Sequence, residues 1–133
     1  MIETAEEFIR LRFSGVAGER DRAVREEAAT GVWGEILRRY PDARMWVAQN
    51  KTVPIEVLEV LAGDVDPQVR TMVAMKRKLS PAILRRLAGD VDDSVRLAVA
   101  RHRKTPCDIL EHLQNDEWEE VREVAEERLR NVG

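Results

Sequence analysis

This chain repeats a segment every 26 residues. The three copies read VLEVLAGDVDPQVRTMVA at 57–74, ILRRLAGDVDDSVRLAVA at 83–100 and ILEHLQNDEWEEVREVAEE at 109–127. Leu58, Leu84 and Leu110 occupy the same place in each copy. A fixed period of this length is typical of a solenoid, because one repeat cannot bury its apolar face alone and stacks on its neighbours. The sequence therefore predicts an all-α solenoid, a class that presents extended binding surfaces more often than closed catalytic pockets.

Each regular repeat is predicted to contain two helices. The first begins near a proline, whose fixed φ suits a helix start; these prolines are Pro54, Pro81 and Pro106. It ends near Gly63 or Gly89, the residue type that adopts the left-handed conformation after a helix. The second begins after Asp66 or Asp92, each placed to accept hydrogen bonds from the first backbone N–H groups of the helix. The leucines of the first helices, Leu84 and Leu110 among them, are expected to be buried between stacked repeats.

The 133 residues are expected to form a single helical-repeat domain. Residues 1–43 contain degenerate N-terminal repeats, residues 44–116 the regular repeats and residues 117–133 a C-terminal capping helix. The aromatic side chains gather in the irregular N-terminal part, where a capping repeat would close the core; they are Phe8, Phe13, Trp33, Tyr40 and Trp46.

The phrases VAQNKTVPIEVLEVLAGDVDPQVR and VARHRKTPCDILEHLQNDEWEEVR resemble the leucine-rich repeat variant, a bacterial repeat of the form VAxNxxTPxxxLxxLAxDxDxxVR that is related to HEAT repeats. The resemblance covers residues 44–125, and residues 17–43 more weakly. It implies a right-handed α-solenoid of alternating α- and 3₁₀-helices. Some members of the family bind an iron–sulfur centre through an N-terminal cysteine cluster. The single cysteine of this chain, Cys107, does not match that cluster, so no cofactor is expected.

The repeated Asp-x-Asp pairs invite two interpretations. Asp64-Val-Asp66 and Asp90-Val-Asp92 supply carboxylate oxygens, which Mg²⁺ and Ca²⁺ prefer, but the further ligands and the glycine turn of a calcium loop do not follow. The alternative is that one aspartate of each pair caps a helix and the other bonds to an arginine of its own or an adjacent repeat. These arginines recur once per repeat, at Arg44, Arg70, Arg96 and Arg122, and could instead form a row that binds phosphate. We expect the ladder of aspartates and arginines, and no metal.

Catalytic and zinc-binding patterns are not found. His102, His112 and Cys107 are the only His and Cys residues, fewer than the four ligands of a usual zinc site, and we expect two surface histidines and a lone thiol. The three serines lie in no nucleophile motif. The sequence therefore predicts neither an enzyme nor a small-molecule substrate.

Basic residues recur in equivalent turns of successive repeats. We call this set the basic edge; it comprises Lys51, Lys76, Arg77, Lys78, Arg101, Arg103 and Lys104. Stacked repeats would align these residues, and a row of like charges is costly unless it serves a ligand that carries negative charge. The alternative is that they are ordinary solvated turns. The net charge of the whole chain is −3, so the basic edge opposes the sign of the total.

The expected function is a noncatalytic scaffold that binds another protein with an acidic surface. Nucleic acid is the alternative partner, although no aromatic residues interleave with the basic ones for base stacking. Self-association is a third possibility, because residues 70–104 have ten Lys and Arg against three Asp, whereas residues 105–133 have nine acids against three Arg. No apolar run reaches the ~18 residues of a membrane span, and the acidic start (Glu3, Glu6, Glu7) is unlike a secretory signal. A cytoplasmic protein is expected.

Overall fold

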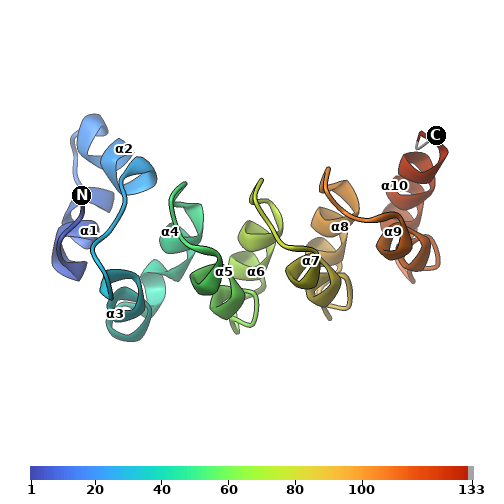
Figure 1. The fold of residues 1–133 in the computed structure, drawn as a ribbon, viewed down its shortest axis with the longest axis horizontal. Helices are drawn as coiled ribbons and strands as arrows, with labels where there is room; N and C mark the ends of the chain where they lie inside the picture. Colours follow the sequence, from blue (N-terminus) through green and yellow to red (C-terminus); the bar gives the residue numbers. More distant parts are fainter. Residues whose placement is uncertain (132–133) are drawn as a thin grey trace. The chain divides into compact units, whose positions relative to one another are not determined.

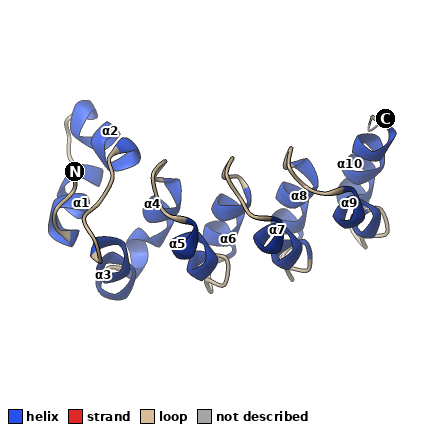
Figure 2. Cartoon of the chain, viewed as in Figure 1, coloured by secondary structure: helices blue, strands red, loops and turns tan. Residues whose placement is uncertain are grey.

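The chain is all-helical in the computed structural model, which describes residues 1–131. Within that range it forms ten α-helices and one 3₁₀-helix, with no strand (Figure 2). No helix in it is both long and apolar enough to cross a membrane. The all-α prediction is therefore confirmed for these residues. The chain divides into two compact units, Met1–Leu61 and Ala62–Gly133, which we call the N-terminal and C-terminal units.

The C-terminal unit consists of two rows of helices (Figure 1). One row contains α6 (Pro67–Ala74), α8 (Asp93–Arg101) and α10 (Glu119–Arg130), which pack side by side in that order. The other row contains α7 (Pro81–Ala88) and α9 (Cys107–Leu113), each packed against the helix that follows it. These are the two helices that the sequence predicts for each repeat. The end of the predicted capping segment, Val132 and Gly133, lies outside the described residues.

Local sequence explains where these helices begin. The carboxylates of Asp66 and Asp92 accept hydrogen bonds from the backbone N–H groups of Gln68 and Ser94, both at 2.8 Å, so both predicted N-caps are confirmed. The predictions for Gly63 and Gly89 are wrong, because neither residue has a positive φ. Gly89 is the C-cap residue of α7 with φ −98°. Gly31, with φ 85° before α3, is the one described residue with a positive φ.

The core of the C-terminal unit is built from leucines and small aliphatic residues. Leu84 and Leu110 are fully buried, which confirms their predicted burial. Leu87, Leu113 and Val95 are buried with them. Both helices of each repeat in this unit are α-helices, so the alternation of α- and 3₁₀-helices that the family resemblance implies is not found among its described residues. The single described 3₁₀-helix, η1 (Pro41–Ala43), lies in the N-terminal unit.

The N-terminal unit contains the shorter and less regular repeats. Its α-helices are α1 (Ala5–Arg12), α2 (Ala17–Arg25), α3 (Val32–Arg39), α4 (Arg44–Gln49) and α5 (Ile55–Leu61). Phe8 and Trp33 pack edge to face with ring centres 5.4 Å apart, and the Arg12 guanidinium lies 3.4 Å from the ring centre of Trp46. Phe13, expected in this aromatic cluster, is instead 61% exposed. It is the C-cap residue of α1, beyond the last helical residue, and the Arg12 guanidinium lies 5.5 Å from its ring centre.

Candidate functional site

The repeated arginines link successive repeats of the C-terminal unit. The Arg70 side chain donates to the backbone oxygen of Asp64, six residues earlier, at 2.7 Å. Its Nε and Nη2 also donate to the two carboxylate oxygens of Asp90, in the next repeat, at 2.7 and 3.1 Å. This two-pronged geometry suits the planar guanidinium. The hydrogen bonds that Arg70 donates to Asp90 raise the pKa of Arg70, while burial opposes this increase.

Arg96 repeats this arrangement one repeat later. It donates to the backbone oxygen of Asp90 at 2.8 Å and to both carboxylate oxygens of Asp116 at 2.8 and 3.2 Å. The side chains of Arg96 and Asp116 are only 9% and 7% exposed. Burial would raise the pKa of Asp116, but the hydrogen bonds from Arg96 and the backbone hold it below the ordinary value. The predicted ladder is therefore confirmed at Arg70 and Arg96, each of which binds an aspartate of the following repeat. Arg96 also donates to the carboxylate of Asp93 in its own repeat at 2.5 Å.

The aspartate pairs have structural roles in this ladder. Asp90 accepts from the backbone N–H of Asp92 at 2.9 Å and from Arg70, while Asp92 caps α8. Asp64 accepts in the same way from the N–H of Asp66 at 3.0 Å. These carboxylate oxygens thus accept hydrogen bonds that cap the helices and link the repeats. Those bonds explain the Asp-x-Asp spacing, and a metal ion is not needed to explain it.

Buried polar side chains hold the turns of neighbouring repeats together. His102 is 8% exposed, so the expectation of two surface histidines is wrong for His102 and right for His112. The Nδ1 atom of His102 accepts from the backbone N–H of Lys104 at 3.1 Å. The imidazole is therefore the Nε2–H tautomer, which donates to the backbone oxygen of Lys76 at 2.6 Å. This bond joins the turn after α6 to the turn after α8.

The same position carries a comparable side chain in other repeats. Asn50, 52 residues before His102, is fully buried and donates to the backbone oxygens of Ala23 and Glu26 in the N-terminal unit at 2.8 and 3.0 Å. Arg128, 26 residues after His102, donates to the backbone oxygens of Ala100 and His102. Sequence reasoning placed Lys76 in the basic edge and His102 on the surface, and it missed this role. Their spacing of 26 residues was the available signal.

The basic edge separates into residues with and without partners. Lys76 has an interaction within the chain, and Arg101 forms an ion pair with Glu120 at 3.2 Å. The side chains of four exposed residues of the C-terminal unit form no hydrogen bond or ion pair with the described residues; we call them the unpaired turn cations, and they are Arg77, Lys78, Arg103 and Lys104. Lys51, in the turn after α4, is exposed in the N-terminal unit.

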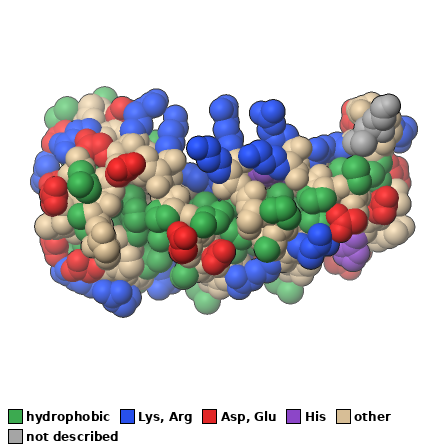
Figure 3. All heavy atoms as spheres, viewed as in Figure 1, with side chains coloured by type: hydrophobic (Ala, Val, Ile, Leu, Met, Phe, Trp, Pro, Cys, Tyr) green, Lys and Arg blue, Asp and Glu red, His purple; other side chains and the backbone are tan. Residues whose placement is uncertain are grey.

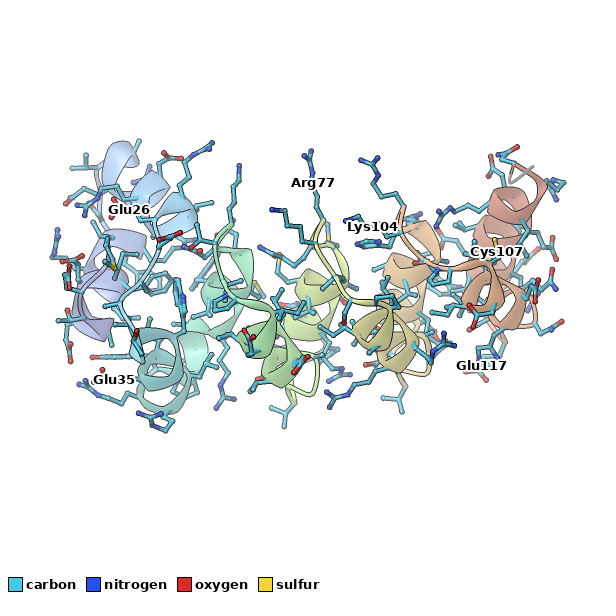
Figure 4. All side chains as sticks on the ribbon, in the orientation of Figure 1. Glu26, Glu35, Arg77, Lys104, Cys107 and Glu117 are labelled. Atoms are coloured by element: carbon cyan, nitrogen blue, oxygen red, sulfur yellow. The ribbon has the colours of Figure 1, made fainter. Side chains whose placement is uncertain are left out.

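The turns of the C-terminal unit present these cations together. Figure 3 shows blue side chains projecting from the turns after α6 and α8. Figure 4 shows Arg77 and Lys104 on this side of the unit, with Glu117 on the opposite side. The bond from His102 to the Lys76 backbone fixes the two turns relative to each other, so their cations are held in one patch.

An apolar groove of about 550 Å³ lies beside these turns, between α6 and α8. Its lining is apolar along the helices and basic at the turns; it comprises Thr71, Ala74, Met75, Arg77, Ser94, Leu97, Ala98, Arg101, His102 and Arg103. Met75, the last residue before the turn, is 66% exposed. We call this feature the α6–α8 groove.

No family model, curated protein or solved structure matches the chain.

Three of the seven basic-edge residues line the α6–α8 groove, namely Arg77, Arg101 and Arg103. Its apolar residues were not predicted as part of a site. Met75 takes the place of Arg101 in the 26-residue register, and this change from a charged to an apolar exposed residue was the signal that could have found the groove.

Proposed function

We propose that the chain is a noncatalytic, cytoplasmic helical-repeat scaffold, a right-handed solenoid of the leucine-rich repeat variant kind, that binds an acidic protein through its turns. The observation that carries the proposal is the contrast between two sets of cations. Arg70 and Arg96 are neutralised inside the repeat ladder. Arg77, Lys78, Arg103 and Lys104 have no such partner among the described residues, although the chain has more acidic than basic residues.

Two features of the repeats support the solenoid and the noncatalytic role. The packing of α6, α8 and α10 in one row, with a bond from each arginine to the following repeat, is an arrangement that further repeats could extend. Two of the three serines have structural partners: Ser80 caps α7, and Ser14 donates to Glu19 at 2.7 Å.

A matched pair of double variants tests the proposal. Arg77→Glu/Arg103→Glu reverses two unpaired turn cations. Arg38→Glu/Arg130→Glu makes the same change in net charge at two exposed arginines outside the turns. Each tagged variant and the parent would be used to capture and identify partners from the source cell by mass spectrometry. We expect the turn variant to lose a protein that the parent and the control variant both retain.

Two other outcomes of this capture experiment would lead to different conclusions. Equal capture by both double variants would show that the turns are solvated and would contradict the proposal. Recovery of nucleic acid in place of an acidic protein, with log K falling linearly against log salt, would assign the turns to phosphate binding.

A further inference from the structure

We infer that the α6–α8 groove binds a protein segment in which one apolar side chain is flanked by carboxylates. This inference rests on the proposed function and specifies what the partner brings to the turns. It begins from the composition of the groove, which is apolar on its floor and basic at one end.

The floor of the groove can accept an aliphatic or aromatic side chain. Ala74 and Ala98 are small, so the groove between the helices stays open, and Leu97 lies largely buried beneath it. Met75 stands at its edge with most of its surface exposed. An unbranched thioether adapts its shape to different partners, and burying apolar surface is the main favourable term in association.

The basic end of the groove determines the charge of the partner. Arg77 and Arg103 occupy equivalent positions in successive turns and line the groove without a carboxylate partner in the described chain. Arg101 also lines the groove, and its ion pair with Glu120 is exposed, so a partner's carboxylate can compete for it. Guanidinium groups bind carboxylates in a two-pronged geometry, so an acidic segment satisfies all three.

The groove favours a protein segment over nucleic acid. Single-stranded nucleic acid binds through bases stacked on aromatic side chains. The side chains that line the α6–α8 groove are aliphatic, hydroxyl or basic, apart from the ring of His102, which is committed to its two backbone hydrogen bonds. A peptide with an apolar side chain flanked by acidic residues would contact both the apolar floor of the groove and its basic end. A phosphate backbone would contact the basic end alone.

The probe for the test is a peptide library displayed on phage, selected against the full chain. We expect the enriched peptides to contain a large apolar residue with Asp or Glu within a few positions. Synthetic copies of these peptides, labelled with a fluorophore, would then be titrated with the parent and the variants by fluorescence polarisation.

Ser94→Trp is the variant that fills the groove. Ser94 is exposed near the start of α8, and only its backbone N–H is used in the helix cap, so the substitution leaves the cap intact. Val91→Trp adds the same side chain to the turn before α8, at a residue that does not line the groove. We expect Ser94→Trp to weaken peptide binding by roughly tenfold or more, since it displaces the buried anchor, and Val91→Trp to leave binding unchanged. Matching thermal melts would show that both variants are folded.

Failure of the inference can be told apart from failure of the proposed function. If Arg77→Glu/Arg103→Glu abolishes peptide binding but Ser94→Trp does not, the turns bind an acidic partner and the groove inference is overturned. If neither variant changes the affinity, both are overturned. Enrichment of peptides without acidic residues, or a random single-stranded oligonucleotide that displaces the peptides at equal concentration, would also overturn the inference.

Discussion

Arg96 and Arg77 lie in the same unit and carry the same charge, but their surroundings differ. Arg96 is buried, and each of its polar contacts is with a neighbouring aspartate, Glu117 or the backbone. Arg77 is exposed in a turn, with no ion pair to the described residues. Removing one partner of a buried pair leaves the other charge uncompensated, whereas removing an exposed charge costs little. Residues of one type therefore serve folding in one place and are available for binding in the other.

Arg122 provides an internal control for the structural arginines. It donates to the backbone oxygen of Asp116 at 2.8 Å, as Arg96 does to Asp90, but it pairs with no carboxylate among residues 1–131. We expect Arg96→Ala to lower the free energy of unfolding by roughly 3–5 kcal/mol, because Asp116 would be left buried and unpaired. Arg122→Ala should lower it by about 1 kcal/mol, the typical net value of one hydrogen bond. Denaturant unfolding of the two variants measures this difference, and equal losses would contradict the account of the ladder.

The Asp116 carboxylate makes part of the stability dependent on pH. Its pKa in the folded chain lies below the ordinary value of 3.8. A depressed folded-state pKa contributes stability that is fully present above the ordinary value and is lost as pH falls through the folded one. At neutral pH the parent should exceed Asp116→Asn in unfolding free energy by roughly 1–3 kcal/mol. Below about pH 4 the difference should shrink. A difference that stays constant down to pH 2 would show that the ion pair is not its source.

At the level of helices, the first helix of each repeat supplies the buried leucines. Leu84 in α7 and Leu110 in α9 are at most 1% exposed. Leu84→Ala and Leu110→Ala should each lower the free energy of unfolding by roughly 2–5 kcal/mol, because a cavity remains where the side chain was. Val91→Ala, in the exposed turn before α8, is the control and should change it little. Losses as small as that of the control would show that the helical register is wrong.

The sequence was sufficient to predict features that depend on local spacing. The caps at Asp66 and Asp92 follow from the position of an acceptor before a helix, and the buried leucines follow from the 26-residue period. The sequence did not show which carboxylate each ladder arginine would bind. Each of these arginines has one aspartate six residues earlier in the chain and another in the next repeat. The choice depends on how the helices stack, which places Asp116, not the Asp90 carboxylate, in front of Arg96.

The candidate site was less predictable than the helices for a related reason. The basic edge was identified by charge alone. Charge does not distinguish Lys76, whose backbone is bonded to His102, from Arg77, which points into solvent. The α6–α8 groove depends on the space between two helices that are adjacent in the fold and separated in sequence by α7. Its size follows from Ala74 and Ala98, residues that also read as ordinary core positions.

At the scale of the whole molecule, we propose that the unpaired turn cations serve a partner and not the fold. Residues that are kept for binding do not have to contribute to stability, and a cluster of like charges detracts from it. This distinguishes them from the ladder arginines, whose removal should destabilise the chain. The two groups can therefore be separated by a measurement of stability that needs no knowledge of the partner.

The most direct test of the account is the free energy of unfolding of the variant Arg77→Gln/Lys78→Gln/Arg103→Gln/Lys104→Gln, measured beside the parent at low and at high salt. We predict that the variant is at least as stable as the parent at low salt, because repulsion within the patch is removed. The difference should disappear at high salt, where the charges are screened. A loss of more than about 1 kcal/mol, beyond the usual range of surface substitutions, would show that these cations serve the fold and would contradict the account.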